Sequence, residues 1–300
     1  MMPDRHRFEF ERIGRAARAS LAPGRRGSVL AVFRRSFYAE FDGGALACVG
    51  PGGMGAGPIN ALADLPDGLD WQASGLAVGG RAYVDGRHLK VGHAFEFGIA
   101  SAADWLPSGP APHWSASTLA AGLAEVRRAA GRYDLSQGLA NLVAGDPAVG
   151  DILIERGHAG AVALKEWLTD PAYRDRPPSD EVRELIGLGP GLTPSGDDLI
   201  GGALIALHAF GEVDRQAALA DWALPIAQGR TGKISFAHLS CAAEGEGAAA
   251  LHHAIAGMAA HDVRAIANAI ADLDTIGHSS GWDALAGAVT VMSSLVPDRV

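Results

Sequence analysis

The pattern of apolar positions divides the chain into a strand-like part and a helical part. From Ser28 to about Ile99, glycine-rich turns such as DGG, PGG and VDGR separate short apolar or alternating runs, namely VLAVF, SFYAEF, ALACVG, SGLAVGG, RAYVD and HLKVGHAFEF. Short apolar runs bounded by such turns are typical of strands. We therefore expect a small antiparallel or barrel-like sheet in this part of the chain.

Beyond Pro107–Pro112 (PSGPAP), the chain becomes rich in alanine and its apolar residues recur at helical spacing, as in STLAAGLAEVRRAA and VRAIANAIADL. This period is typical of helices packed on a core. The pattern predicts an α+β protein. Residues 1–110 form a mainly antiparallel β domain with an N-terminal helical lead-in, and residues 111–300 form a larger, mainly α-helical domain with glycine-rich loops at helix N-termini.

The stretch from Gly187 to Gly202, GLGPGLTPSGDDLIGG, predicts a tight loop that leads into a buried helix, because glycine and proline both break regular structure. Ser195 stands where an N-cap is expected, with Asp198 three residues on. Ordinary capping would explain both residues. The backbone N–H groups of such a helix start can also bind an anion, and glycines let a ligand approach the main chain. The candidate binding residues here are Gly189, Gly191, Thr193, Ser195, Gly196 and Asp197.

A second stretch, Gly277 to Ala288 (GHSSGWDALAGA), repeats part of the first. When SGDDLIGGA (195–203) is set over SGWDALAGA (280–288), Ser, Gly, Asp, Gly and Ala coincide. In each copy, a glycine follows the aspartate by four residues and shares its helix face. Our hypothesis is that the two helix N-termini converge on one polar site that contains Asp198 and Asp283. A chance match in a glycine-rich chain is the alternative. If the two helix starts do converge, the site would also be lined by Ser279, Ser280 and Gly281.

Between these stretches, GRTGKIS (Gly229–Ser235) lacks the spacing of a phosphate-binding P-loop. Arg230 offers a guanidinium fork for a carboxylate or phosphate, Lys233 offers a point charge, and Thr231 lies between them. A solvated helix end is the alternative for all three. His278 precedes the second helix start and could act as an acid, a base or an oxyanion donor, or could serve only as a structural hydrogen-bonding group.

The charge balance limits what the site can bind. A net charge of −9 argues against a nucleic-acid partner. Asp197 and Asp198 would repel a phosphate dianion unless Arg230, Lys233 or a divalent ion screened it. The two aspartates therefore predict hydrogen bonds to an amide or ureido N–H, or a site for Mg²⁺ against a phosphate. The sequence contains no Cys/His cluster with the spacing of a zinc site, so zinc is not expected.

Several features bear on location. The chain has no apolar run of transmembrane length and no apolar region typical of a secretory signal, so we expect no membrane association. Cys48 and Cys241 are expected to be buried thiols in a reducing compartment, which favours the cytoplasm. The turn at Gly57 and Pro58 is a weaker candidate for contact with a ligand, because it ends a glycine-rich loop between strands.

The motifs LIGLGPGLTPSGDDLIGG, GRTGKIS and IGHSSGWDALAG resemble those of the AllH-type subunit family of oxamate carbamoyltransferase. The middle motif departs from the family's commoner form, which has threonine or asparagine before Ile-Ser. The resemblance implies a part in anaerobic allantoin breakdown, in which oxalurate and phosphate give oxamate and carbamoyl phosphate, and it implies two other types of subunit. The implied ligands are carbamoyl phosphate, phosphate or a ureido acid.

The residues themselves suggest roles for this chemistry. Attack of phosphate on a ureido carbonyl places negative charge on oxygen, which helix N-terminal N–H groups can stabilise. Asp198, Asp283 and His278 are the candidate catalytic residues. Two alternatives stay open. The chain could be a non-catalytic subunit that binds an anion or scaffolds its partners, or it could be a metal-dependent amide or ureide hydrolase.

Overall fold

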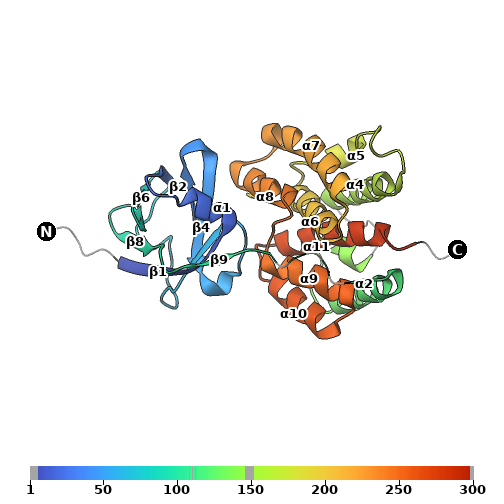
Figure 1. The fold of residues 1–300 in the computed structure, drawn as a ribbon, viewed down its shortest axis with the longest axis horizontal. Coiled ribbons are helices and arrows are strands. Elements are labelled where there is room, and N and C mark those ends of the chain that lie inside the picture. The colour runs from blue at the N-terminus through green and yellow to red at the C-terminus, as the bar shows by residue number, and fades with distance from the viewer. Residues whose placement is uncertain (1–5, 108, 110, 112, 146–151, 298–300) are drawn as a thin grey trace. The chain divides into compact units, whose positions relative to one another are not determined.

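The computed structural model describes residues 6–107, 109, 111, 113–145 and 152–297. The chain forms two compact units, Met1–Pro107 and Ser108–Val300. Figure 1 shows strands in the first unit and helices in the second. Within the described part of the chain, none of the helices combines the length and the apolar character needed to cross a membrane.

The first unit consists of short strands with one short helix. Its strands are β1 (His6–Gly14), β2 (Arg26–Val32), β3 (Phe37–Phe41), β4 (Ala45–Pro51), β5 (Asn60–Ala63), β6 (Arg81–Asp85), β7 (His88–Val91), β8 (Phe95–Gly98) and β9 (Ala103–Trp105). Helix α1 (Arg15–Ser20) follows β1, so the N-terminal stretch predicted as a helical lead-in is mostly a strand. The predicted strand SGLAVGG is instead a series of turns, in which Gly75 and Gly79 have positive φ angles.

The sheet order is β5-β4-β3-β2-β6-β7-β8-β1-β9, and a further pairing of β5 with β1 closes the sheet into a barrel. The prediction of a mainly antiparallel domain is wrong, because β1 pairs in parallel with β8 and β9, and β4 pairs in parallel with β5. Tight turns make β2–β3, β3–β4, β6–β7 and β7–β8 antiparallel, as the sequence suggests. The strands that pair in parallel are connected by longer segments, so no tight turn determines their relative direction.

The barrel interior is filled by aromatic and small apolar side chains. Every second residue of β3, namely Phe37, Ala39 and Phe41, is buried, as expected for a strand with one face on a core. Trp71, from the turn region, is fully buried, and its ring centroid lies 5.0 Å from that of Phe37 and 5.1 Å from that of Phe95. These ring contacts fix the interior of the first unit.

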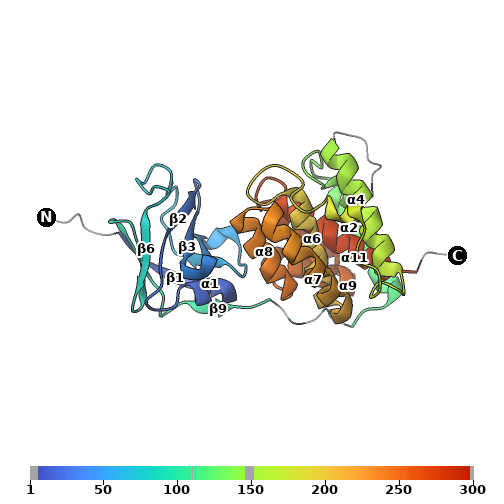
Figure 2. The same ribbon diagram turned by 90° about the horizontal axis from the view of Figure 1, so that it is seen from above.

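The second unit is helical, as predicted. Its helices are α2 (Ala116–Ala130), α3 (Asn141–Ala144), α4 (Ile152–Thr169), α5 (Asp180–Arg183), α6 (Ser195–Ala209), α7 (Val213–Arg230), α8 (Lys233–Ala243), α9 (Ala249–Ala260), α10 (Val263–Leu273) and α11 (Ser280–Ser294). Helices α6 and α11 are buried on nearly all sides, as helices that are apolar all round should be. They lie side by side and contact α2, α4, α7, α8 and α9 between them, as Figure 2 also shows.

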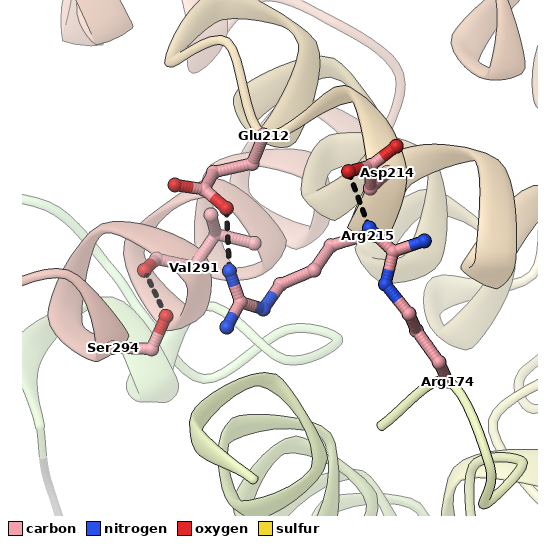
Figure 3. Close-up of polar contacts among 6 residues, drawn as sticks. All are labelled: Arg174, Glu212, Asp214, Arg215, Val291 and Ser294. Carbon is pink, nitrogen blue, oxygen red and sulfur yellow. Dashed lines mark hydrogen bonds and ion pairs between the residues drawn. The ribbon is translucent and has the colours of Figure 1, made fainter. Parts of the chain in front are cut away.

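At the N-terminal end of α7, two arginines flank one aromatic ring. The guanidinium carbon of Arg215 lies 4.7 Å from the ring centroid of Tyr173, and that of Arg174 lies 5.4 Å from it. Each arginine also forms an ion pair, Arg215 with Glu212 and Arg174 with Asp214 (Figure 3). These contacts connect α7 to the segment that follows α4.

Candidate functional site

The starts of α6 and α11 meet because two glycines let the helices cross at backbone contact. A Cβ added to Gly202 of α6 would lie 1.9 Å from the carbonyl oxygen of Ala284, and one added to Gly287 of α11 would lie 1.9 Å from that of Leu199. These glycines occupy equivalent positions in the two SGxD copies. The two helices are therefore related by an approximate two-fold axis at the crossing. Asp198 and Asp283 each lie one helical turn before the glycine of their own helix.

Ser195 and Ser280 are the first residues of their helices rather than the N-caps that the sequence suggested. The N-cap residues are Pro194 and Ser279, and neither uses a side chain to cap the helix. The carbonyl of Pro194 accepts the N–H groups of Asp197 and Asp198 at 2.9 and 3.1 Å. The serine hydroxyls are therefore available for contacts across the helix pair.

Those hydroxyls cross between the two copies. Ser280 of α11 hydrogen-bonds Asp198 of α6, and Ser195 of α6 hydrogen-bonds Asp283 of α11. Thr193, from the loop before α6, also hydrogen-bonds Asp198. The Thr193 hydroxyl lies 2.9 Å from the Ser280 hydroxyl. The two SGxD motifs thus form one polar cluster.

Asp283 is the better satisfied of the two aspartates. It is fully buried, and its carboxylate accepts the Leu139 N–H at 2.6 Å and the Ser279 hydroxyl at 2.8 Å. Gly138 has a φ of +56°, and a Cβ there would lie 2.4 Å from Asp283 Oδ1. Burial raises the pKa of Asp283, while the hydrogen bonds from Leu139, Ser279 and Ser195 lower it.

Asp198 is the less satisfied one. Its Oδ2 is buried and has no hydrogen-bond partner among the described residues. Burial raises the pKa of Asp198 well above its usual range, and the charge of Asp283 raises it further, while Ser280 and Thr193 oppose the shift. A carboxyl group in such a place favours its neutral form, and can then donate a hydrogen bond or a proton.

Asp197 points away from this cluster and holds two helix starts together. Its Oδ1 accepts the Gly187 N–H at 2.8 Å, and its Oδ2 accepts the hydroxyls of Thr231 and Ser235, the latter at 2.6 Å. Both oxygens of Asp197 are therefore occupied by protein donors. Across the described residues, no group of three or more His, Cys, Asp or Glu side chains could hold a metal ion.

The candidate cations lie at the edge of this region. Arg230 Nη1 donates to the carbonyl of Arg183 at 3.3 Å, and its Nη2 lies 3.8 Å from Glu184, so its fork already faces the segment around α5. Lys233 is the exposed first residue of α8, two positions before Ser235. Asp197 ties that helix start to the start of α6.

The remaining candidates divide into packed and exposed residues. Gly196 and Gly281 face the carbonyl oxygens of Leu185 and Leu273, where a Cβ would lie at 1.9 and 2.1 Å, so close packing explains both glycines. Gly191 and His278 are exposed. Gly189 has a φ of +115°, and a Cβ there would lie 2.9 Å from the Ser195 nitrogen.

The Gly57–Pro58 turn belongs to the first unit. The carbonyl oxygen of Pro58 accepts the Ala17 N–H at 2.9 Å, and Gly14 packs against the carbonyl of Gly57. The turn thus anchors the start of α1.

Sequence reasoning missed the segment that supplies Gly138 and Leu139. It lies between α2 and α3, more than a hundred residues before Asp283, and its signal is only a single glycine in SQGLANLVA. The backbone N–H that it donates is carried by any residue type except proline, so no side chain could mark it.

The match with a known family covers this region. No solved structure gives a significant match to the chain. The family model described as "Oxamate carbamoyltransferase subunit AllH" matches residues 185–292, a segment that begins just after α5, ends within α11 and holds both SGxD motifs. Residues 185–292 of the chain are therefore similar to the AllH-type family of oxamate carbamoyltransferase subunits.

Proposed function

We propose that the chain is a working subunit of a carbamoyltransferase that acts on a small ureido acid, and that the polar cluster at the starts of α6 and α11 belongs to its active site. The observation that carries this proposal is the buried Asp198 Oδ2, which has no hydrogen-bond partner in the described part of the chain and lies beside a second, better satisfied carboxylate, Asp283. Buried polar atoms are nearly always satisfied, so an exception suggests a role beyond packing.

The chemistry requires a proton at the leaving nitrogen. A phosphate oxygen attacks the carbamoyl carbon of oxalurate, the bond from that carbon to the oxamate nitrogen breaks, and the nitrogen takes up one proton. Neutral Asp198 is suited to supply that proton, and the proton on the attacking phosphate restores it. Asp283, whose two oxygens are occupied by Leu139 and Ser279, would not touch the substrate but would help to keep Asp198 neutral through its charge.

The other candidates have supporting roles in this proposal. Lys233 and the glycine loop from Gly187 to Thr193 would bind the phosphate or the substrate carboxylate. His278, which is exposed, would act at the entrance rather than on the reacting atoms. Companion subunits complete the enzyme, as the word "subunit" in the family description suggests. A cytoplasmic location stays a prediction.

The test compares Asp198→Asn with Asp221→Asn in the assembled enzyme. Asp221 is exposed on α7, away from the cluster. We expect Asp198→Asn to lower kcat by about a hundredfold or more, the usual contribution of a general acid, and Asp221→Asn to leave it unchanged. Formation of carbamoyl phosphate from oxalurate and phosphate is the measurement. Unchanged turnover in Asp198→Asn would remove the proposed role, and binding of oxalurate without any turnover in the wild type would favour a binding subunit.

A further inference from the structure

A groove runs along the outer face of α4. Its floor is apolar and is formed by residues at helical spacing on that helix, namely Ala159, Val162, Ala163 and Trp167. Val162 is 57% exposed. The other wall is the segment Arg176–Glu181, which leads into α5. The groove belongs wholly to the helical unit.

The rim of this groove is acidic. Its charged lining residues are four carboxylates and one guanidinium, namely Glu155, Glu166, Asp170, Glu181 and Arg176. Arg176 lies 3.5 Å from Asp170, so the one cation among the described lining residues is already beside an acid. A partner that covers the apolar floor must therefore carry positive charge beside its own apolar stripe.

The groove walls are held in place. Trp167 Nε1 donates to the carbonyl of Arg176 at 2.8 Å, and the Ser179 hydroxyl donates to Glu181 at 2.6 Å. His158 lines the groove with a buried Nε2 that has no partner among the described residues, and burial lowers its pKa, so its ring is neutral at physiological pH. Binding here would need little rearrangement.

We propose that this groove on α4 is the docking site for a basic amphipathic helix of a companion subunit. This inference rests on the proposed function in one respect, that the chain works inside a multi-subunit enzyme. A second copy of the chain suits the groove less well, because each copy carries a net charge of −9. An amphipathic helix lays its apolar face into a groove of this kind through residues spaced three and four apart.

The test uses the full chain and two labelled helical peptides of about 15 residues. Both have leucines at helical spacing; one has lysines and the other glutamates at the remaining positions. We expect the lysine peptide to bind, as measured by fluorescence anisotropy, and the glutamate peptide not to bind. Val162→Lys should weaken binding about tenfold or more. Val213→Lys is the matched control, because Val213 is also 57% exposed but lies at the start of α7.

Other results would contradict the proposal. Equal binding of the two peptides, or equal affinity of Val162→Lys and the wild type, would overturn it. Self-association of the wild type that Val162→Lys abolishes would assign the groove to a second copy instead. Asp198→Asn should bind the lysine peptide like the wild type, so a loss of turnover and a loss of docking are separate results.

Discussion

Gly202 of α6 and Gly287 of α11 stand at equivalent places in the crossing of the two helices, and each faces the main chain of the other helix. A Cβ on either one would lie 1.9 Å from a carbonyl oxygen. Because backbone atoms cannot rotate away as side chains do, these two positions accept only glycine. The crossing fixes how close the two helix starts come, and it thereby fixes the polar cluster.

Gly202→Ala should destabilise the protein. The added methyl group would clash with the Ala284 carbonyl, and overpacking of this kind costs about 1–3 kcal/mol or more. Gly201→Ala is the matched control in the same helix, because its Cβ would meet side chains only at 3.7 and 3.8 Å. That change should increase the free energy of unfolding by about 0.5–1 kcal/mol through helix propensity. Urea denaturation measures the free energy of unfolding of both variants. Equal changes in Gly202→Ala and Gly201→Ala would contradict the close crossing of the helices.

Asp198→Asn should stabilise the folded chain at neutral pH. Burial raises the folded-state pKa of Asp198 above its ordinary value of 3.8, so the folded state binds a proton that the unfolded state releases. The contribution of this group to stability is greatest below pH 3.8 and is lost as the pH rises toward the folded-state pKa. Asparagine mimics the neutral acid at every pH.

The measurement for Asp198→Asn is the free energy of unfolding from about pH 5 to pH 8. The advantage of the variant over the wild type should grow across this range. A constant difference would mean that Asp198 is already ionised in the folded state at about pH 5. Together with lower turnover, greater stability would indicate that the wild type retains this acid for function.

Asp283→Asn should have the opposite effect. Asp283 accepts the Leu139 N–H on one oxygen and the Ser279 hydroxyl on the other, and a carboxamide can accept on only one side. Leaving one buried donor unpaired costs about 1–3 kcal/mol. Thermal denaturation of this variant beside Asp198→Asn provides the comparison. Equal melting temperatures would contradict the different surroundings of the two carboxyl groups.

The repeat of SGxD predicted from sequence that the starts of α6 and α11 meet, because the glycine after each aspartate marked the face where the helices touch. The same pattern misled at Ser195 and Ser280, whose hydroxyls hydrogen-bond the opposite helix instead of capping their own. Capping preferences describe one helix by itself, so they carry no information about a partner helix. Likewise, the parallel pairing of β1 with β8 depends on a long connection that no turn residue specifies.

Arg215→Ala should destabilise the protein more than Arg174→Ala. Both arginines flank Tyr173. Each also pairs with an acid, as Figure 3 shows. The side chains of Arg215 and Glu212 are only 28% and 31% exposed, whereas those of Arg174 and Asp214 are 64% and 65% exposed. Water and salt screen the exposed pair, so its loss should have little effect.

The Arg215 contacts lie closer to the protein interior. Removing this side chain loses a stacking contact worth about 1 kcal/mol and leaves Glu212 without its partner. Urea denaturation at low and high salt separates the two arginines, because only the Arg174 variant should converge on the wild type as salt rises. Equal losses for the two variants would mean that burial does not determine their contributions. In that case the ring contact, which they share, would account for both.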